Sequence, residues 1–325
     1  MKLILADIGG TNARFAVSVQ GDPLPRHITN LRCTDFEGFE DAFERFLAGL
    51  PRDEQSGYHE MSLAVAGPVN DQIVDISNNH WQFEKNWLLD RLGLNKLLMI
   101  NDFTAQALAQ HEATDFDRSQ LLDGVDDAKA PLLVIGPGTG LGVSALIPVA
   151  QGPLPVEGEG GNIRFTPQTE PERDLYAYME QQTDHVVVEH FVSGPGLENI
   201  YRFLTYAASN EPSLSAEIIA TTALREEGIC RDAVNLMIGI LGAVMGDHVL
   251  TMGCWRGAVI TGGIMPRLQP LIVSSPLERR FRSVGEMSHI LGKVPVWLST
   301  DPHAGLKGAR AAFDNPYLAH RMVTG

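Results

Sequence analysis

Short apolar segments alternate with helix-like patterns along most of the chain, and this alternation predicts an α/β protein. In the first third, strands are expected at residues 2–6, 13–19, 61–66, 72–76 and 97–100. Helices are expected there at about 36–50, 84–92 and 103–110. Because the segment 97–100 is entirely apolar, we expect it in the middle of a sheet.

A polar, acidic stretch at 115–129 separates this block from a second one with the same kind of pattern. The strands expected in the second block are 132–135, 143–148, 258–260 and 294–298. Its expected helices are 172–182, 196–208, 215–226, 232–252 and 304–313. Polar residues and glycines interrupt the long apolar segment 234–252, which therefore predicts a buried helix and not a membrane span.

The first apolar segment leads into a turn that predicts a β-hairpin, and the turn carries Asp7, Gly9, Gly10, Thr11 and Asn12. Glycines let backbone N–H groups approach an anion closely, so the turn suits a phosphate group. Since Asp7 would repel a bare phosphate, we expect a metal ion or its waters between the two. An ordinary hairpin turn is the alternative for this segment taken alone.

Two further glycine turns follow apolar strands. Gly138 and Thr139 suit a second phosphate clamp, and the strand–turn–strand pattern around them indicates a weak internal repeat of the N-terminal hairpin. Gly262 and Gly263 follow the strand expected at 258–260, and we expect them near the nucleoside. Glycine turns are common, and it is the set of three that favours a nucleotide site.

Polar residues follow the buried strand at 97–100. Asn101 and Asp102 stand where this strand meets a helix, the edge at which open α/β sheets bind ligands. A carboxylate there can accept a proton from a substrate hydroxyl. The alternative is an aspartate that only caps its helix.

One acidic segment suits a ligand rich in hydroxyl groups, and a second acidic residue precedes a helix start. The glycine-rich segment 157–162 carries Glu159 and Asn162, and a flexible acidic loop is its alternative interpretation. Glu189 precedes Ser193, which predicts the start of a helix.

The bulk properties restrict the class of protein. A chain of 325 residues is long enough for two domains that share a cleft. The formal charge of -15 argues against nucleic acid and against an anionic membrane surface. Three cysteines far apart predict neither a zinc site nor disulfides. Reduced, buried thiols are typical of a cytoplasmic protein, and because the first strand starts at once we expect no signal peptide.

The motifs, taken in order, resemble those of the bacterial glucokinases of the proteobacterial type, and the resemblance covers nearly the whole chain. The segments that carry it are 7–14, 77–81, 100–105, 136–142, 158–161, 193–197, 261–266 and 301–308. The resemblance implies a two-domain ribonuclease H-like fold of the actin/hexokinase type, with an inter-domain cleft. The small domain would be 1–105 plus 304–325, and the large domain 106–303.

The resemblance also implies a function, the phosphorylation of glucose to glucose 6-phosphate by a homodimer that uses ATP and Mg²⁺. Asp102 would be the general base on the 6-hydroxyl. The residues that would bind the sugar are Asn78, Asn101, Asp102, Glu159, Asn162 and Glu189. Asp7 and its turn would hold the phosphates together with Gly138 and Thr139, and Asp7 would reach the metal through water.

One departure from the family pattern concerns the sugar. The family usually has His after Gly-Glu-Gly-Gly, whereas this chain has Asn162, which hydrogen-bonds but does not titrate. A kinase for fructose, mannose or an N-acetylated amino sugar is therefore the alternative. A sugar-sensing regulator is disfavoured because the turn at Asp7 leaves no room before it for a DNA-binding module. A chaperone-like ATPase is disfavoured because it has no use for Asp102 and Glu159.

Overall fold

The computed structural model describes residues 2–19, 24–69, 71–77, 79–206 and 213–325. The chain divides into two compact units by the contacts among its residues. Unit 1 comprises Met1–Ala113, Leu146–Glu157 and Asp301–Gly325, and unit 2 comprises Thr114–Ala145 and Gly158–Thr300. The domain limits expected from the sequence stay a prediction.

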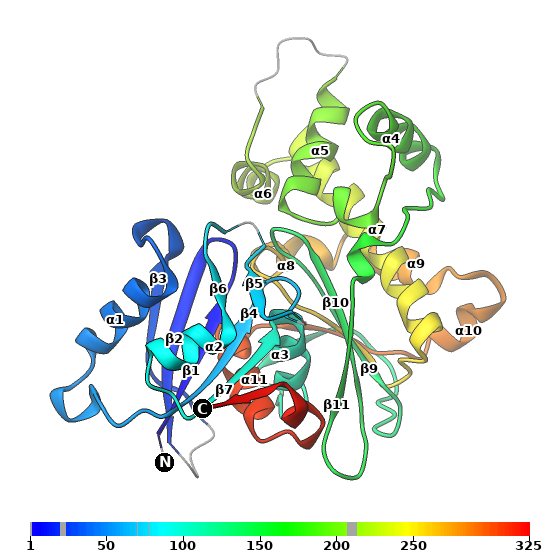
Figure 1. Ribbon diagram of the computed structural model, residues 1–325. Helices are drawn as coiled ribbons and strands as arrows, with labels where there is room; N and C mark the ends of the chain where they lie inside the picture. The colour runs from blue at the N-terminus through cyan, green and yellow to red at the C-terminus, as the bar shows by residue number, and fades with distance from the viewer. Residues whose placement is uncertain (1, 20–23, 70, 78, 207–212) are drawn as a thin grey trace. The chain divides into compact units, whose positions relative to one another are not determined.

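A six-stranded sheet with the order β14-β7-β4-β1-β2-β3 is the framework of unit 1 (Figure 1). Its strands are β1 (Lys2–Ile8), β2 (Asn12–Val19), β3 (Arg26–Arg32), β4 (Glu60–Val65), β7 (Lys96–Asn101) and β14 (Met322–Thr324). The central strands β1, β4 and β7 are parallel, and β2, β3 and β14 pair antiparallel with their neighbours. A separate hairpin joins β5 (Ile73–Asp75) and β6 (Gln82–Glu84).

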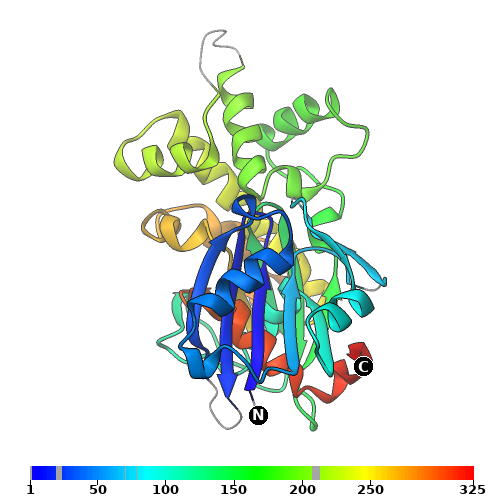
Figure 2. The same cartoon turned by 60° about the vertical axis from the view of Figure 1, so that its left-hand side comes forward.

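Helices cover both faces of this sheet because successive side chains of β1 point to opposite faces. Ile4 packs in the cluster that faces α1, and Leu3 packs in the cluster that faces α11. Figure 2 shows α1 lying across the strands, where its phenylalanine rings meet Phe15 of β2. The helices of unit 1 are α1 (Phe39–Gly49), α2 (Lys85–Arg91), α3 (Asp102–Ala109) and α11 (Ala304–Phe313), with 3-10 turns at Cys33–Asp35, Arg52–Glu54 and Pro316–Arg321.

The second sheet has the order β11-β10-β9-β12-β13-β8. Its strands are β8 (Arg118–Leu122), β9 (Leu132–Pro137), β10 (Leu141–Ile147), β11 (Leu154–Gly158), β12 (Gly257–Ile260) and β13 (Val296–Ser299). β12 is parallel to both β9 and β13, and β8 is an antiparallel edge strand. The order β3-β2-β1-β4-β7 of the first sheet is repeated by β11-β10-β9-β12-β13, so the internal repeat expected from the glycine turns is present.

The long apolar segment forms a buried helix, as predicted. In the described part of the chain, α7 (Ile229–Met252) is the one helix long and apolar enough to cross a membrane, and 78% of its apolar window is buried in the protein. Gly242 and Gly246 let it pack closely on α9, whose backbone would overlap side chains at these positions. The other helices of unit 2 are α4 (Glu170–Glu180), α5 (Gly194–Thr205), α6 (Ala216–Arg225), α8 (Met265–Ile272), α9 (Leu277–Arg282) and α10 (Ser288–Leu291), with 3-10 turns at Gly160–Asn162, Val188–His190 and Gly285–Met287.

The structure corrects one sequence interpretation. The stretch 115–129 was expected only to separate the two blocks, but it contains β8, which pairs with β13. Edge strands are often short and polar, so an apolar pattern does not reveal them. β3 and β14 are two further edge strands that the pattern did not predict, because β3 is largely polar and β14 is only three residues long. Cys33, Cys230 and Cys254 are free thiols.

Replacing Gly308 of α11 with alanine is expected to destabilise unit 1. An added Cβ would overlap the carbonyl oxygen of Ala105, so α11 would have to move away from α3. Overpacking of this kind costs about 1–3 kcal/mol in the free energy of unfolding, which urea titration measures. Gly49→Ala is the matched control, because a Cβ there meets nothing within 4 Å. Equal stability of the two variants would contradict this packing argument.

Candidate functional site

The turn at Asp7 is a tight β-hairpin, as the sequence predicts. Asp7 pairs with Arg14 across the two strands, and the N–H of Gly9 donates to the carbonyl of Asn12 at 2.9 Å. The carbonyl of Gly9 accepts from the side chain of Asn79 at 3.1 Å, which fixes the turn from the neighbouring segment. Thr11 at the tip is exposed, and Gly10 before it is half-buried. The turn therefore presents backbone and hydroxyl groups to solvent on a rigid base.

Asp7 itself is buried, with 7% of its surface exposed. Burial raises the pKa of its carboxyl, and the charge and hydrogen bond of Arg14 oppose this rise. The Arg14 guanidinium lies 3.1 Å from Oδ2 of Asp7. The first turn of α11 packs on the same carboxylate at Gly305, where any larger side chain would overlap it.

Asn101 and Asp102 lie at the junction of β7 and α3. Asn101 is the N-cap of α3, because its Oδ1 accepts from the N–H of Phe103 at 2.8 Å. Its Nδ2 donates to the carbonyl of Gly67 at 3.1 Å, so the same side chain joins the ends of β7 and β4. Asp102 also accepts from the Phe103 N–H, at 2.9 Å, and is half-buried. Since Asn101 is the N-cap of the helix, capping does not by itself explain why an aspartate stands at position 102.

The residues predicted in unit 1 thus lie along one edge of one sheet. β1, β4 and β7 are parallel, and Asp7, Gly67 and Asn101 stand at or just after their carboxyl ends. This is the edge where α/β sheets bind ligands. Asn78, predicted to bind the sugar, lies outside the described residues.

In unit 2, Glu189 joins the predicted phosphate turn. Its Oε2 accepts from the N–H of Leu141 at 2.7 Å, directly after the turn formed by Gly138, Thr139 and Gly140. Gly140 has no room for a side chain, because a Cβ there would lie 2.5 Å from that oxygen. Gly138 and Thr139 are both exposed. The carboxylate that was predicted to bind the sugar therefore contacts the turn that was predicted to bind phosphate.

The loop that carries Glu159 and Asn162 lies against the same strand. A Cβ on Gly161 would overlap the carbonyl of Leu141, so the loop and the start of β10 are in close contact. Glu159 and Asn162 are exposed at the two ends of this 3-10 turn. Leu141 is thus bonded to Glu189 on one side and packed against this loop on the other.

The third glycine turn is also adjacent. β12 and β9 are parallel neighbours, and the N–H of Thr261 donates to the carbonyl of Ile135 at 2.8 Å. Gly262 has a φ of 97° and lies so close to the carbonyl of Pro137 that only glycine fits. Unit 2 therefore brings together the predicted residues that were far apart in its sequence.

The sequence interpretation missed two groups beside these residues. Thr104 of α3 donates to Oε1 of Glu157, and Arg321 binds the other oxygen of the same carboxylate. This network links α3, the helix that begins at Asp102, to the end of β11 and to the 3-10 turn at Pro316–Arg321. No local pattern pairs Thr104 with Arg321, because more than 200 positions separate them.

The second missed group is His248 of α7, which lies under the loop at Gly160. Its ring hydrogen-bonds to the backbone of Gly160, and its Nε2 has no hydrogen-bond partner in the described part of the chain. Burial lowers the pKa of His248, and the hydrogen bond to Gly160 partly opposes this effect. The only signal in the sequence was a polar residue inside an apolar helix.

Known proteins are similar to this chain along almost its whole length. The family model described as glucokinase matches residues 4–316. The glucokinase of Helicobacter pylori strain J99 is 38% identical over 98% of this chain and 97% of its own length. That of Aromatoleum aromaticum is 36% identical over 96% of this chain and 94% of its own.

Solved structures give the same fold. The glucokinase from an Antarctic psychrotroph is 31% identical, with a TM-score of 0.82 over 97% of this chain and 99% of its own. The glucokinase of Balamuthia mandrillaris in complex with glucose has a TM-score of 0.78 at 20% identity, over 98% of this chain and 93% of its own, which shows the fold alone. The fold and the glycine turns thus define a sugar kinase of the actin-like ATPase class. Within that class, the chain belongs to the glucokinase family.

We expect His248 to make stability depend on pH. Because burial lowers the pKa of His248, the folded protein binds a proton there at a lower pH than the unfolded chain, whose pKa is the ordinary value of about 6.5. Lowering the pH through that value therefore favours unfolding, by up to about 1.4 kcal/mol per pH unit. His248→Gln should lose less stability than the unsubstituted protein between pH 7.5 and 6.0, measured by urea titration.

The exposed His59 provides the control for this experiment. His59→Gln should keep the pH dependence of the unsubstituted protein. If His248→Gln also kept the pH dependence of the unsubstituted protein, His248 would not be the source of that dependence.

Proposed function

We propose that this chain transfers the γ-phosphoryl group of ATP to the 6-hydroxyl of glucose, with Asp102 as the general base. The observation that supports it is the position of Asp102. It is a half-exposed carboxylate at the carboxyl end of a central parallel strand, on the sheet edge that also carries the turn at Asp7. Membership of the glucokinase family gives the reaction. The position of Asp102 supports it as the residue that accepts the proton.

Asp102 would accept the proton of the hydroxyl as its oxygen attacks the γ-phosphorus and the bond to ADP breaks. Asp102 is the first residue of α3, where the helix dipole stabilises a negative charge and keeps the carboxylate ready to accept a proton. Phosphoryl transfer depends mainly on positioning and charge stabilisation. The cap made by Asn101 and its bond to Gly67 supply that positioning.

The remaining hydroxyl groups of the sugar would bind to the carboxylates and amides named above. In unit 2 these are Glu189, Glu159 and Asn162, which lie around Leu141. Asn101 is their counterpart in unit 1, and we keep Asn78 as a prediction from the sequence. One oxygen of Glu189 is already bonded to the Leu141 N–H, so its other oxygen would accept from the sugar.

The glycine turns would bind the nucleotide. Exposed Thr139 and Gly138 would donate to phosphate oxygens, as would the backbone of Gly10 and Thr11. The turn at Gly262 and Gly263 lies beside that of Gly138, because both follow neighbouring parallel strands. We assign Gly262 and Gly263 to the nucleoside side of ATP.

Asp7 fits a role beside Mg²⁺. Magnesium takes few protein carboxylates and keeps waters and substrate phosphates as its other ligands. A buried carboxylate, which a cation would favour in its ionised form, suits this role through an intervening water. When bound, Mg²⁺ would neutralise charge on the β- and γ-phosphates. We further propose a homodimer in the cytoplasm, as the resemblance to this family implies.

Asp102→Asn is the test of the proposed base. The amide keeps the shape of the carboxylate but does not accept the proton, so kcat should fall by about 10² or more. Glucose affinity, measured by titration calorimetry, should change little. Asp184→Asn, at an exposed position, should keep full activity in the coupled assay for ADP. Near-normal turnover of Asp102→Asn would remove Asp102 from this role.

Asn162→His tests the departure from the family pattern. An imidazole reaches differently from an amide, and one net hydrogen bond of about 1 kcal/mol corresponds to roughly a fivefold change in kcat/KM. We expect the ratio of kcat/KM for glucose to that for mannose to change by at least this factor. Asn95→His, exposed at the other end of β7, should leave the ratio unchanged. An unaltered ratio in Asn162→His would show that position 162 does not select the sugar.

A further inference from the structure

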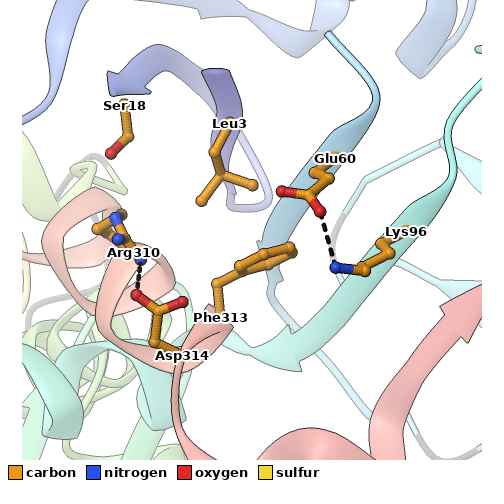
Figure 3. A pocket seen from close by; sticks show the side chains of 7 residues that line it. All are labelled: Leu3, Ser18, Glu60, Lys96, Arg310, Phe313 and Asp314. Atoms are coloured by element: carbon orange, nitrogen blue, oxygen red, sulfur yellow. Dashed lines mark hydrogen bonds and ion pairs between the residues drawn. The ribbon is translucent and has the colours of Figure 1, made fainter. Parts of the chain in front are cut away.

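A cavity lies where the parallel strands of the first sheet begin, at the opposite end from the candidate site. Its volume is about 260 Å³, and Figure 3 shows the seven side chains that line it, from Leu3, Ser18, Glu60, Lys96, Arg310, Phe313 and Asp314. Glu60 and Lys96 are the first residues of β4 and β7, whereas the candidate active-site residues follow the ends of the same strands. The cavity is therefore separate from the site already described.

Its polar groups stand on two sides, with apolar groups between them. Glu60 and Lys96 form an ion pair of 2.8 Å on one side, and Arg310 and Asp314 form one of 2.6 Å on the other (Figure 3). Phe313 and Leu3 lie between the two pairs.

The two ion pairs differ in which side chain is buried, the acidic one in the first pair and the basic one in the second. On one side the carboxylate of Glu60 is buried, with 9% of its side chain exposed, whereas Lys96 is 47% exposed. On the other side the guanidinium of Arg310 is 19% exposed, whereas Asp314 is 67% exposed. An exposed partner contributes little to such a pair and moves away readily. The cavity thus keeps a fixed negative charge on one side and a fixed positive charge on the other.

Ser18 adds an unused hydrogen-bonding group on the side of Arg310. It is 1% exposed, and its Oγ has no hydrogen-bond partner in the described part of the chain. Buried hydroxyls are almost always paired, so an unpaired one that lines a cavity points to a missing ligand or water. Its hydroxyl and the Arg310 guanidinium are together suited to a carboxylate.

We propose that this cavity binds a small zwitterion, with its ammonium group on Glu60 and its carboxylate on Arg310 and Ser18. The two charged groups of the ligand are separated by an apolar segment that packs on Phe313 and Leu3. On binding, these groups replace the exposed partners Lys96 and Asp314. An engineered cavity of about 150 Å³ holds benzene, so this cavity has room for roughly ten non-hydrogen atoms.

The test is titration calorimetry of the whole protein with the series from 4-aminobutanoate to 6-aminohexanoate. At least one member should bind saturably, and hexanoate and hexylamine should bind at least tenfold more weakly, because each lacks one charge. Arg310→Gln and Ser18→Ala should each weaken binding of that member, the former by tenfold or more. Arg52→Gln, at an exposed position on the surface of unit 1, is the matched control and should bind as the unsubstituted protein does.

Arg310 and Ser18 lie outside the candidate active site, so both variants should retain glucose phosphorylation, which also reports that they are folded. Binding by no member of the series at 10 mM would overturn the proposal. The proposal would also be overturned if Arg310→Gln and Ser18→Ala bound the aminoalkanoate as tightly as the unsubstituted protein does. Hexanoate that bound as tightly as the aminoalkanoate would exclude a zwitterion. None of these outcomes depends on the assignment of Asp102.

Discussion

A buried carboxylate at the end of β1 constrains the structure around the site. Burial disfavours the ionised form of Asp7, and its charge is compensated by Arg14, which the hairpin register places directly opposite. The hairpin therefore has to keep its pairing for this charge to be stable. The same carboxylate requires glycine at position 305, so the start of α11 is fixed against it. One interaction thus holds the turn, the strand pair and the C-terminal helix in one arrangement.

The two sheets repeat this design with different residues. In each sheet a hairpin turn follows the first parallel strand, and a hydrogen bond closes it, at Gly9 in one and at Gly138 in the other. In each a glycine with positive φ follows the next parallel strand, Gly67 with 114° and Gly262 with 97°. The third strand is followed by an aspartate and a helix in both sheets, Asp102 with α3 in the first and Asp301 with α11 in the second. Asp301 forms an ion pair of 2.6 Å with Lys307, so the two aspartates have different surroundings.

Helix α11 shows how small residues organise unit 1. Gly305 lets it reach Asp7, and Gly308 lets its backbone touch that of α3, the helix that begins at Asp102. Its other end supplies Arg310 and Phe313 to the cavity beside Glu60 and Lys96. The bounds of this helix are those predicted from the sequence, 304–313. The sequence pattern did not show which helix α11 packs against, because α3 lies about 200 positions earlier in the chain.

The sequence by itself determined the apolar strands, most helices, the glycine turns and the family, because these depend on local composition and on the order of motifs. It did not determine β8 or β14, because β8 is largely polar and β14 is only three residues long, and the pairing of each comes from its partner strand. It gave Glu189 and Glu159 as separate acidic segments, and folding placed both around Leu141. Only the tertiary structure decided these contacts, because backbone pairing and close packing join segments whose separation in sequence carries no signal of proximity.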